Sequence, residues 1–384
     1  MDPKDFRDTT SGRLVKTVEN AWAFVPNPLP PKIEYDSKLS LLLSEADISL
    51  GDLSGTGRRL SNPYLLISPY IRREAVSSSA IEGTIASLSD LFFYEASEPK
   101  KPKVPDVREV KNYVRAMEHG LEQLSKLPIS IRLVRDTHKI LMEGVRGSEM
   151  ALGEIRRRQN WIGPPNCKIK EATYVPPPIN ELGNALSDWE KYLHSDPDEP
   201  PLIQCALMHY QFEAIHPFLD GNGRVGRLLI PFFLCERRFL SQPLLYLSAF
   251  FEKYRNDYYS TLLAVSQRGE WRGWIEFFLR GVATQAQDAI SNATKILDLH
   301  VEFQGTLGRA ENVPAHTHRL IEEIFLSPVF SISKISAKWG IQFKSVQRAV
   351  EKLMEIGILQ EVTGKVRGKI FSAPKLLDVL IGQE

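Results

Sequence analysis

Residues 216–227 read His-Pro-Phe-Leu-Asp-Gly-Asn-Gly-Arg-Val-Gly-Arg. This stretch starts where one segment with helical periodicity, 201–215, ends, and it runs into the next, 223–237. It is therefore predicted to be the turn between two helices. Gly-Asn-Gly at 221–223 tolerates strained backbone and would place successive N–H groups at the N-terminus of the second helix. Such a turn predicts an anion-binding loop.

Four charged or titratable side chains accompany this loop. Arg224 and Arg227 are three residues apart on one helix face, where their planar guanidinium groups suit adjacent phosphates. Asp220 offers a hard oxygen ligand for Mg²⁺ shared with those phosphates. His216 is an imidazole that can take a proton from an incoming hydroxyl. The stretch thus predicts a base, a metal ligand, a phosphate cradle and a clamp.

The surrounding chain is predicted to be mainly α-helical, because helical periodicity dominates and β-branched alternation is scarce. Residues 153–178, rich in Arg, Gly and Pro, favour a short β-hairpin and an irregular loop, and strands of the core are expected only there. Helices are expected at residues 107–124, 130–141, 179–193, 201–215, 223–237, 253–265 and 271–297.

The string at 216–227 resembles the signature of the Fic family, which runs His, any residue, Phe, any residue, Asp or Glu, Gly-Asn-Gly-Arg, two residues, Arg. Every fixed position is met. The likeness extends over about residues 10–297, because the segment ending in Trp161-Ile162-Gly163 resembles the family's flap and Tyr258-Tyr259 resembles a recurring pair. The resemblance implies a Fic-type helical core with a small β-hairpin flap.

The resemblance also implies an activity, which is the transfer of AMP from ATP, with Mg²⁺, to a Ser, Thr or Tyr hydroxyl of a target protein and of the enzyme itself. His216 would be the general base, Asp220 would hold the metal, and Phe218 would anchor the loop in the core. Arg227 would reach the γ-phosphate, and Arg224 would steady the phosphate chain. The residues expected to bind ATP are Gly221, Asn222, Gly223, Arg224, Gly226, Arg227, Ile162, Gly163 and Tyr258.

Two of these expectations concern the neighbourhood of the phosphates. Ile162 and Gly163 would cover the nucleotide and register the target segment by strand-like pairing, which needs only extended backbone. Tyr258 would line the nucleoside pocket. Some relatives transfer phosphate or phosphocholine instead, but the complete Gly-Asn-Gly loop with both arginines favours AMP transfer.

Residues 77–83 read Ser-Ser-Ser-Ala-Ile-Glu-Gly and end a predicted helix at 70–81, with Gly83 as its left-handed cap. Glu82 lies where the helix dipole is negative, so its carboxylate is locally disfavoured without a cation. The spacing of Ser78, Glu82 and Gly83 resembles the inhibitory motif of Fic proteins. By that resemblance Glu82 would pair with Arg227 and block the γ-phosphate. Some members with this motif also remove AMP, and that alternative stays open here.

Residues 313–384 are predicted to form a winged helix-turn-helix, with three helices followed by a strand pair. The module carries ten Lys+Arg and seven Asp+Glu, a net charge of +3. DNA binding and protein docking or dimerisation both remain open for it, and a homodimer is expected. The residues that would meet DNA are Lys344, Arg348 and Lys352 on the predicted recognition helix, which is the third of these helices, and Lys365, Arg367 and Lys369 on the wing.

Composition sets the remaining limits. The 384 residues carry a net charge of +1, and no apolar run approaches the ~18 residues of a membrane span. The polar start, MDPKDFRDTT, is unlike a secretory signal, so a cytoplasmic protein is expected. Three domains are predicted: an N-terminal helical region at 1–103 with the inhibitory helix at about 70–83, a Fic core at 104–300, and the winged helix.

Two classes of function compete for the whole protein. The first is an auto-inhibited AMP-transferring enzyme, and the second is a nucleotide-sensing, DNA-binding transcriptional regulator. The intact base, metal ligand and two arginines favour the enzyme, because a sensor would need the cradle but not His216.

Overall fold

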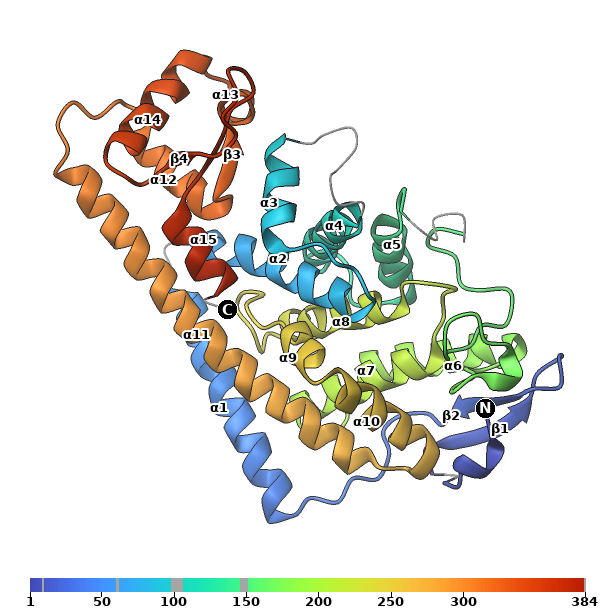
Figure 1. The fold of residues 1–384 in the computed structure, drawn as a ribbon. Helices are drawn as coiled ribbons and strands as arrows, with labels where there is room; N and C mark the ends of the chain where they lie inside the picture. Colours follow the sequence, from blue (N-terminus) through green and yellow to red (C-terminus); the bar gives the residue numbers. More distant parts are fainter. Residues whose placement is uncertain (9, 60–61, 98–105, 146–150, 383–384) are drawn as a thin grey trace. The chain divides into compact units, whose positions relative to one another are not determined.

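The computed structural model describes residues 1–8, 10–59, 62–97, 106–145 and 151–382 (Figure 1). The fold is mainly helical, as predicted. Most helices of the predicted core lie within a few residues of the expected bounds: α4 (Val107–Gln123), α5 (Ile131–Leu141), α6 (Ile179–His194), α7 (Pro201–Ile215), α8 (Asn222–Glu236) and α10 (Arg255–Arg268). α11 (Trp271–Gly308) continues eleven residues beyond the expected end at 297, and the short helix α9 (Ser248–Lys253) was not predicted. Among the described residues, no helix combines the length and hydropathy that crossing a bilayer requires.

The chain forms two compact units, each built from two stretches of sequence. One unit combines Met1–Ser54 with Arg115–Ala286, and the other combines Gly55–Val114 with Gln287–Glu384. This division differs from the three consecutive domains predicted at 1–103, 104–300 and 313–384. The boundaries between the units fall inside α1 (Ser37–Arg59), α4 and α11.

The first unit is organised around α7. This helix is apolar on nearly all sides and is buried along most of its length, as expected for a central core helix. It packs between α6 and α8. Two indole N–H groups are satisfied by its backbone, because Trp189 Nε1 donates to Met208 O at 3.1 Å and Trp274 Nε1 donates to Ala206 O at 2.9 Å. The core therefore fixes the position of the helix that ends at the predicted site.

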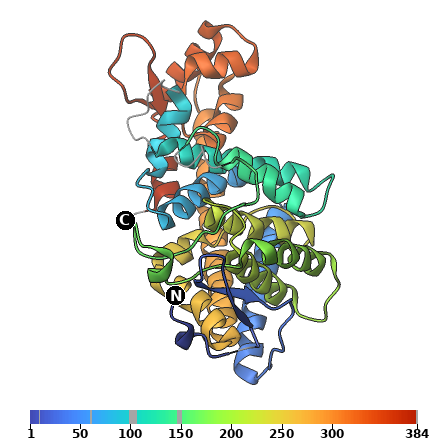
Figure 2. The same ribbon diagram turned by 90° about the vertical axis from the view of Figure 1, so that its right-hand side faces the viewer.

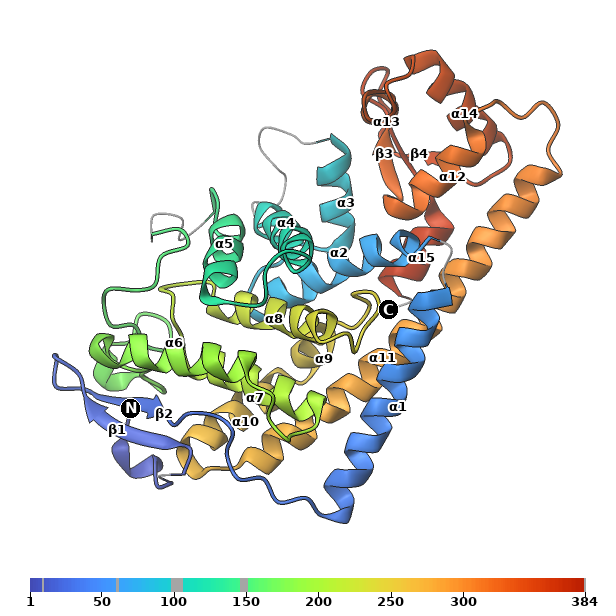
Figure 3. The same ribbon diagram turned by 180° about the vertical axis from the view of Figure 1, so that it is seen from behind.

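An N-terminal β-hairpin is the main feature of this unit that the sequence did not predict. Strands β1 (Gly12–Lys16) and β2 (Trp22–Pro26) pair antiparallel, with Leu14 opposite Phe24. β2 packs against α6 and α7 (Figure 3). The hairpin lies in the region 1–103, which was predicted to be helical, and outside the core in which strands were expected only at 153–178.

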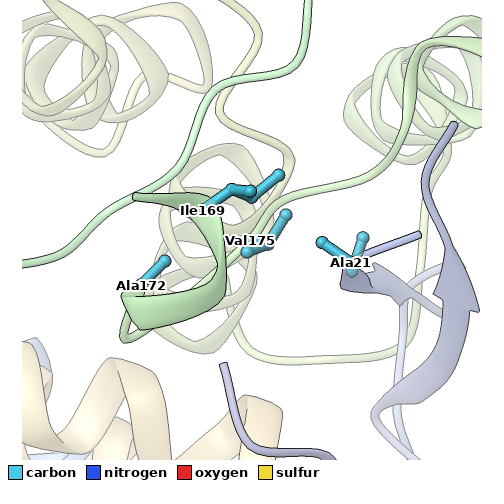
Figure 4. Close-up of a cluster of buried hydrophobic side chains, with 5 residues drawn as sticks. Ala21, Ile169, Ala172 and Val175 are labelled. Atoms are coloured by element: carbon cyan, nitrogen blue, oxygen red, sulfur yellow. The ribbon is translucent and has the colours of Figure 1, made fainter. Parts of the chain in front are cut away.

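The hairpin supports the segment that was predicted to be a flap. Phe24 N donates to Val175 O at 2.8 Å, which joins β2 to the end of that segment. In Figure 2 the dark blue hairpin lies next to green segments of the same unit. Ala21 lies beside Ile169, Ala172 and Val175 in a small apolar cluster (Figure 4). Within the flap itself, one antiparallel bridge joins Ile162 and Tyr174, and the short 3-10 helix η2 (Ile169–Glu171) lies between them. The flap is thus an irregular loop closed by a single bridge, and another 3-10 helix, η1 (Pro3–Asp5), precedes the hairpin.

The second unit joins N-terminal helices to the C-terminal module. α2 (Tyr64–Ile81) packs against α12 (Thr317–Leu326), and α3 (Leu88–Ser97) packs against β3 (Val329–Ser331). Two hydrogen bonds fasten α2: Ser68 Oγ donates to Leu326 O at 2.9 Å, and Tyr70 Oη donates to Ala289 O at 2.9 Å. The helix with the predicted inhibitory motif therefore shares a core with the C-terminal residues.

The C-terminal module has the element order of a winged helix-turn-helix. α12 is followed by β3, α13 (Ile332–Trp339), α14 (Phe343–Glu355), β4 (Gln360–Glu361) and β5 (Ile370–Ser372), and the sheet order is β3-β5-β4. β3 and the final helix α15 (Pro374–Ile381) add to the predicted three helices and strand pair. Five of the six basic residues predicted to meet DNA are exposed, whereas the Lys352 side chain is only 11% exposed and binds Glu355 at 3.0 Å.

Candidate functional site

The loop between α7 and α8 begins at His216, which ends α7 in a left-handed conformation with φ 50° and ψ 62°. Its ring turns back on the helix, and Nδ1 lies 3.2 Å from Glu213 O. Because a carbonyl oxygen only accepts, Nδ1 must carry a proton, and in the neutral ring the lone pair is then on Nε2. This is the tautomer that a general base acting through Nε2 requires.

The last four carbonyl groups of α7 have no partner within the helix, and side chains satisfy them one by one. Glu213 O accepts from the His216 ring, and Ala214 O accepts from Tyr174 Oη at 2.8 Å. Ile215 O lies 3.5 Å from Arg156 Nη2. His216 O accepts from Arg156 Nε at 2.9 Å and from Asn160 Nδ2 at 3.3 Å. The flap residues thus cap the end of α7.

Arg156 is the main anchor of this cap. Its side chain is 3% exposed, and it also donates from Nη2 to Pro177 O at 2.6 Å. Burial lowers the pKa of its guanidinium to about 10, so the group remains charged at neutral pH. The neighbouring Arg157 is 90% exposed. Nothing in the sequence indicated that the first of three consecutive arginines, 156–158, would be buried.

Asn222 fixes the middle of the loop. Its Oδ1 accepts from Phe218 N at 2.8 Å, and its Nδ2 donates to Phe218 O at 2.9 Å. The residue is 2% exposed. The Asn222 side chain therefore ties the loop to itself, which leaves the predicted phosphate contacts of this residue to its backbone. Phe218 is fully buried, which is the geometry that an anchor requires.

A second histidine that the sequence did not single out lies beneath the loop. His138 on α5 stacks on Phe218 with ring centroids 3.8 Å apart and an interplanar angle of 3°. Its Nδ1 accepts from Gly153 N at 3.0 Å, so Nε2 carries the proton and donates to Asp220 O at 3.1 Å. Burial lowers the pKa of His138 to about 4, although the bond to Asp220 acts in the opposite direction. His138 is therefore a neutral, fixed support.

Gly221 is required by both conformation and space. Its φ is 79°, and an added Cβ would lie 2.9 Å from Met142 Sδ. Directly after it, α8 begins, so the first N–H groups of that helix follow a glycine that no larger residue can replace without strain. Gly223, two residues after Gly221, belongs to the first turn of α8.

Asp220, Arg224 and Arg227 surround the start of α8. The Asp220 side chain is 46% exposed, and its Oδ1 accepts from Gly221 N at 2.6 Å and lies 3.6 Å from Arg224 Nη2. Arg224 and Arg227 are 4% and 1% exposed. Two buried guanidinium groups and one accessible carboxylate thus lie at a helix N-terminus.

The described residues contain no cluster of three or more His, Cys, Asp or Glu side chains that could hold a metal ion. The donor set fits Mg²⁺ that is bound by one carboxylate together with substrate phosphates, which is the way proteins commonly bind this ion. Asp220 would supply that carboxylate.

The flap presents a different backbone edge from the one predicted. Ile162 N donates to Tyr174 O at 2.8 Å, and Ile162 O accepts from Thr173 N at 2.8 Å. Both backbone groups of Ile162 are thus used within the flap. An added Cβ on Gly163 would lie 2.7 Å from Cys167 Sγ. Ile162 therefore does not offer its backbone to a target segment, and Trp161 and Gly163 on either side of it are the remaining candidates for that contact.

Tyr258 does not line a nucleoside pocket as predicted. It is 1% exposed and stacks on Phe251 with centroids 4.4 Å apart. Its hydroxyl lies 2.8 Å from His209 Nε2. A ring enclosed in this way has no face for a nucleoside, so its function must be sought inside the core.

The predicted inhibitory residues lie at the end of α2 in the second unit. α2 ends at Ile81, and Gly83 is left-handed with φ 91°, as the sequence predicts. Gly83 N donates to Ala80 O at 2.9 Å, and Ser78 is fully buried. Glu82 follows the last turn directly.

Two patterns of known protein families match this chain between residues 40 and 234. The pattern described as "Fic/DOC family N-terminal" matches residues 40–122, and the pattern described as "Fic/DOC family" matches residues 128–234. The second range contains the whole loop described above. The chain belongs to the Fic/DOC family.

Relatives of known name resemble part of this Fic protein. Protein adenylyltransferase Fic of Drosophila yakuba is 30% identical over 156 residues, which are 40% of this chain and 28% of that protein. The same protein of Drosophila willistoni is 29% identical over an equal length. The match thus spans less than a third of these relatives.

Solved structures share the fold. A Fic family protein from Desulfovibrio desulfuricans superposes with a TM-score of 0.57 at 19% identity, over 90% of this chain and 98% of the other. Fic-1 of C. elegans, solved for residues 134–508, has a TM-score of 0.51 at 20% identity, over 66% of this chain and 73% of the other. At these identities the likeness concerns the fold alone.

Arg156 and Arg157 provide a matched test of the helix cap in the Fic domain. Arg156→Met leaves the carbonyls of Pro177, Ile215 and His216 without this donor, and we expect the free energy of unfolding to fall by about 3 kcal/mol or more. Arg157→Met is expected to change it by less than about 0.5 kcal/mol. Urea denaturation measures both, and equal losses in the two variants would contradict the cap.

Burial of His209 predicts a pH dependence of stability. Its pKa falls from 6.5 to about 3, chiefly through burial, so below about pH 6.5 the unfolded chain binds a proton that the folded chain does not. The free energy of unfolding should therefore decrease as the pH is lowered below about 6.5, by at most about 1.4 kcal/mol per pH unit from this group. His209→Gln should flatten the dependence between about pH 6.5 and pH 4, while His318→Gln, at an exposed position, should not. Parallel curves for all three proteins would refute the assignment.

Proposed function

We propose that this Fic/DOC family protein is an auto-inhibited adenylyltransferase that transfers AMP from ATP to a Ser, Thr or Tyr hydroxyl of a protein. The observation that carries the proposal is the His216 tautomer, because a ring with its Nδ1 proton held by Glu213 O presents a basic Nε2 beside an anion-binding helix terminus. A protein that only sensed nucleotide would have no need for a base held in this way.

The reaction follows from this arrangement. His216 Nε2 takes the proton from the target hydroxyl as the oxygen attacks the α-phosphorus of ATP. The bond from that phosphorus to the α–β bridging oxygen breaks, and pyrophosphate leaves with the electron pair. Such phosphoryl chemistry depends mainly on positioning and charge stabilisation. The N–H groups at the start of α8, Arg224 and Arg227 provide both.

Mg²⁺ would be held by Asp220 and by phosphate oxygens, and when bound it neutralises charge on the phosphates. Asp220 is suited to this because its carboxylate is accessible and its Oδ1 is oriented by Gly221 N. The Arg224 guanidinium lies 3.6 Å from the same carboxylate, so a cation borders the place where the metal and the phosphates would meet.

The target segment would add to the flap as an extended strand. The backbone groups of Trp161 and Gly163, next to the paired Ile162, would bind an extended chain, which makes the pairing independent of sequence. The flap is joined to the site through Arg156 and Asn160, which bind the His216 carbonyl. Pairing at the flap would thereby bring a target hydroxyl into register with the base.

We extend the proposal to regulation by Glu82. In the resemblance noted above, the residue at this position pairs with the arginine equivalent to Arg227 and keeps the γ-phosphate from seating. The support here is local: Glu82 follows a rigid helix whose Ser78 is buried and whose other end is fastened by Ser68 and Tyr70. A brake requires such a firmly held helix.

Labelled ATP tests the activity, the brake and the base together. We expect covalent label from α-labelled ATP on Glu82→Gly, strongly above wild type, and its absence on Glu82→Gly/His216→Ala. His216→Ala should lower the rate by about 10²-fold or more, the usual contribution of general base catalysis.

The other outcomes discriminate between functions. Label from γ-labelled ATP would mean transfer of phosphate. Equal labelling of wild type and Glu82→Gly at saturating Mg-ATP would reject the brake. ATP binding without any label would favour the nucleotide-sensing regulator.

DNA binding by the winged helix is the second candidate function, and the exposure of five of its six predicted basic residues favours it. Replacing Lys365, Arg367 and Lys369 with Ala should weaken binding to duplex DNA and flatten its dependence on salt. Each lost phosphate contact reduces the slope of log K against log salt by about 0.9. Lys191→Ala, a change at an exposed helix position, serves as control. An unchanged slope would leave protein docking as the function of the module.

A further inference from the structure

Arg227 is a fully buried cation, and burial makes its hydrogen-bond partners decisive. Its side chain is 1% exposed, yet a guanidinium has five donors and no acceptor. An arginine in such a place keeps one orientation only if neighbouring acceptors fix it. One of these acceptors is the hydroxyl of Tyr258, on α10, which is hydrogen-bonded to the Arg227 side chain.

The Tyr258 hydroxyl belongs to a chain of hydrogen bonds whose proton positions are determined. His209 Nδ1 lies 3.0 Å from Gly226 O, and a carbonyl only accepts, so Nδ1 carries the proton. His209 Nε2 is then an acceptor, and the Tyr258 hydroxyl 2.8 Å away must donate to it. This leaves the Tyr258 oxygen to accept from Arg227. The chain runs from Arg227 through Tyr258 and His209 to the backbone of Gly226, the residue before Arg227.

The surroundings hold this closed chain in one arrangement. Tyr258 stacks on Phe251 at an interplanar angle of 11°, and His209 lies against Trp274 with ring centroids 5.8 Å apart. Burial keeps His209 neutral, with a pKa of about 3, and raises the pKa of Tyr258 well above its usual range. Neither group changes its charge near neutral pH.

We propose that Tyr258 and His209 are positioning residues that fix the guanidinium of Arg227 for the γ-phosphate and so set the preference for a nucleoside triphosphate over a diphosphate. The inference rests on the proposed function, in which Arg227 meets the γ-phosphate. It assigns to Tyr258 a function that its burial allows, in place of the predicted nucleoside contact. It also gives a function to a histidine that the reaction itself does not use.

The substitution that isolates this function is Tyr258→Phe. It removes one oxygen atom and keeps the ring that packs on Phe251. Tyr210→Phe is a matched control, because Tyr210 is also buried on α7 beside His209, but its hydroxyl bonds Ser266 Oγ at 2.9 Å, outside the chain. A general effect of losing a buried hydroxyl would appear in both variants.

Calorimetric titration with Mg-ATP and Mg-ADP, in the Glu82→Gly full-length protein, tests the proposal. We expect Tyr258→Phe to raise the Kd for Mg-ATP about tenfold, the size of effect that losing a hydrogen bond to a charged group produces. The Kd for Mg-ADP should stay within about twofold, because ADP has no γ-phosphate. Tyr210→Phe should change neither value. The ratio of the two Kd values is insensitive to a misfolded fraction, which lowers only the stoichiometry.

His209→Phe provides the second test. It removes the acceptor for Tyr258 and the donor to Gly226, and we expect the same selective loss of Mg-ATP affinity. Combined with Tyr258→Phe it should add little, because both act through one chain.

Three outcomes would overturn the inference. An equal rise in Kd for both nucleotides would show a structural effect, and unchanged Kd values for both would show that Arg227 does not need Tyr258. Failure of the parent Glu82→Gly protein to bind either nucleotide would contradict the proposed function itself, and with it this inference. Nucleotide binding without AMP transfer would reject the proposed activity while leaving the positioning of Arg227 open to the same comparison of Kd values.

Discussion

The site depends on ending a buried helix in the interior of the protein. α7 stops at His216, which adopts a left-handed backbone at a cost of about 1–2 kcal/mol for a residue with a side chain. Four carbonyl groups then lose their partners in a place that water does not readily reach. The His216 ring, Tyr174, Arg156 and Asn160 satisfy them. The same bonds that prevent this penalty also set the tautomer of His216 and join the flap to the loop, so stability and chemistry share one set of contacts.

The local part of this arrangement could be read from the sequence, because it depends on residues close to one another. The helices on both sides of the loop and the left-handed Gly83 follow from periodicity and spacing, and the buried Phe218 is what the resemblance to the Fic signature implies. The functions predicted for the other residues of the loop come from its resemblance to the Fic signature. Each of these predictions concerns residues within a few positions of a strong local signal.

The partners that support the loop could not be predicted, because they come from distant segments. Arg156 is buried while Arg157 is exposed, although both stand in the same run of arginines. The resemblance of Tyr258-Tyr259 to a recurring pair led to the expectation that Tyr258 lies at the nucleoside. The sequence does not say which way its ring points. The hairpin at β1 and β2 escaped prediction because two five-residue strands among Pro and Asp carry little alternation. In each example the deciding contact joins residues far apart along the chain.

The anchoring of α2 bears on how the two ends of the chain can change in evolution. α2 rests on α12 and is tied by Ser68 to the last residue of that helix, Leu326. A lineage that lost the winged helix would expose the apolar face of α2 and free the segment that carries Glu82. The C-terminal module and the N-terminal helices are therefore expected to be gained, lost or exchanged together in evolution, not as separate domains.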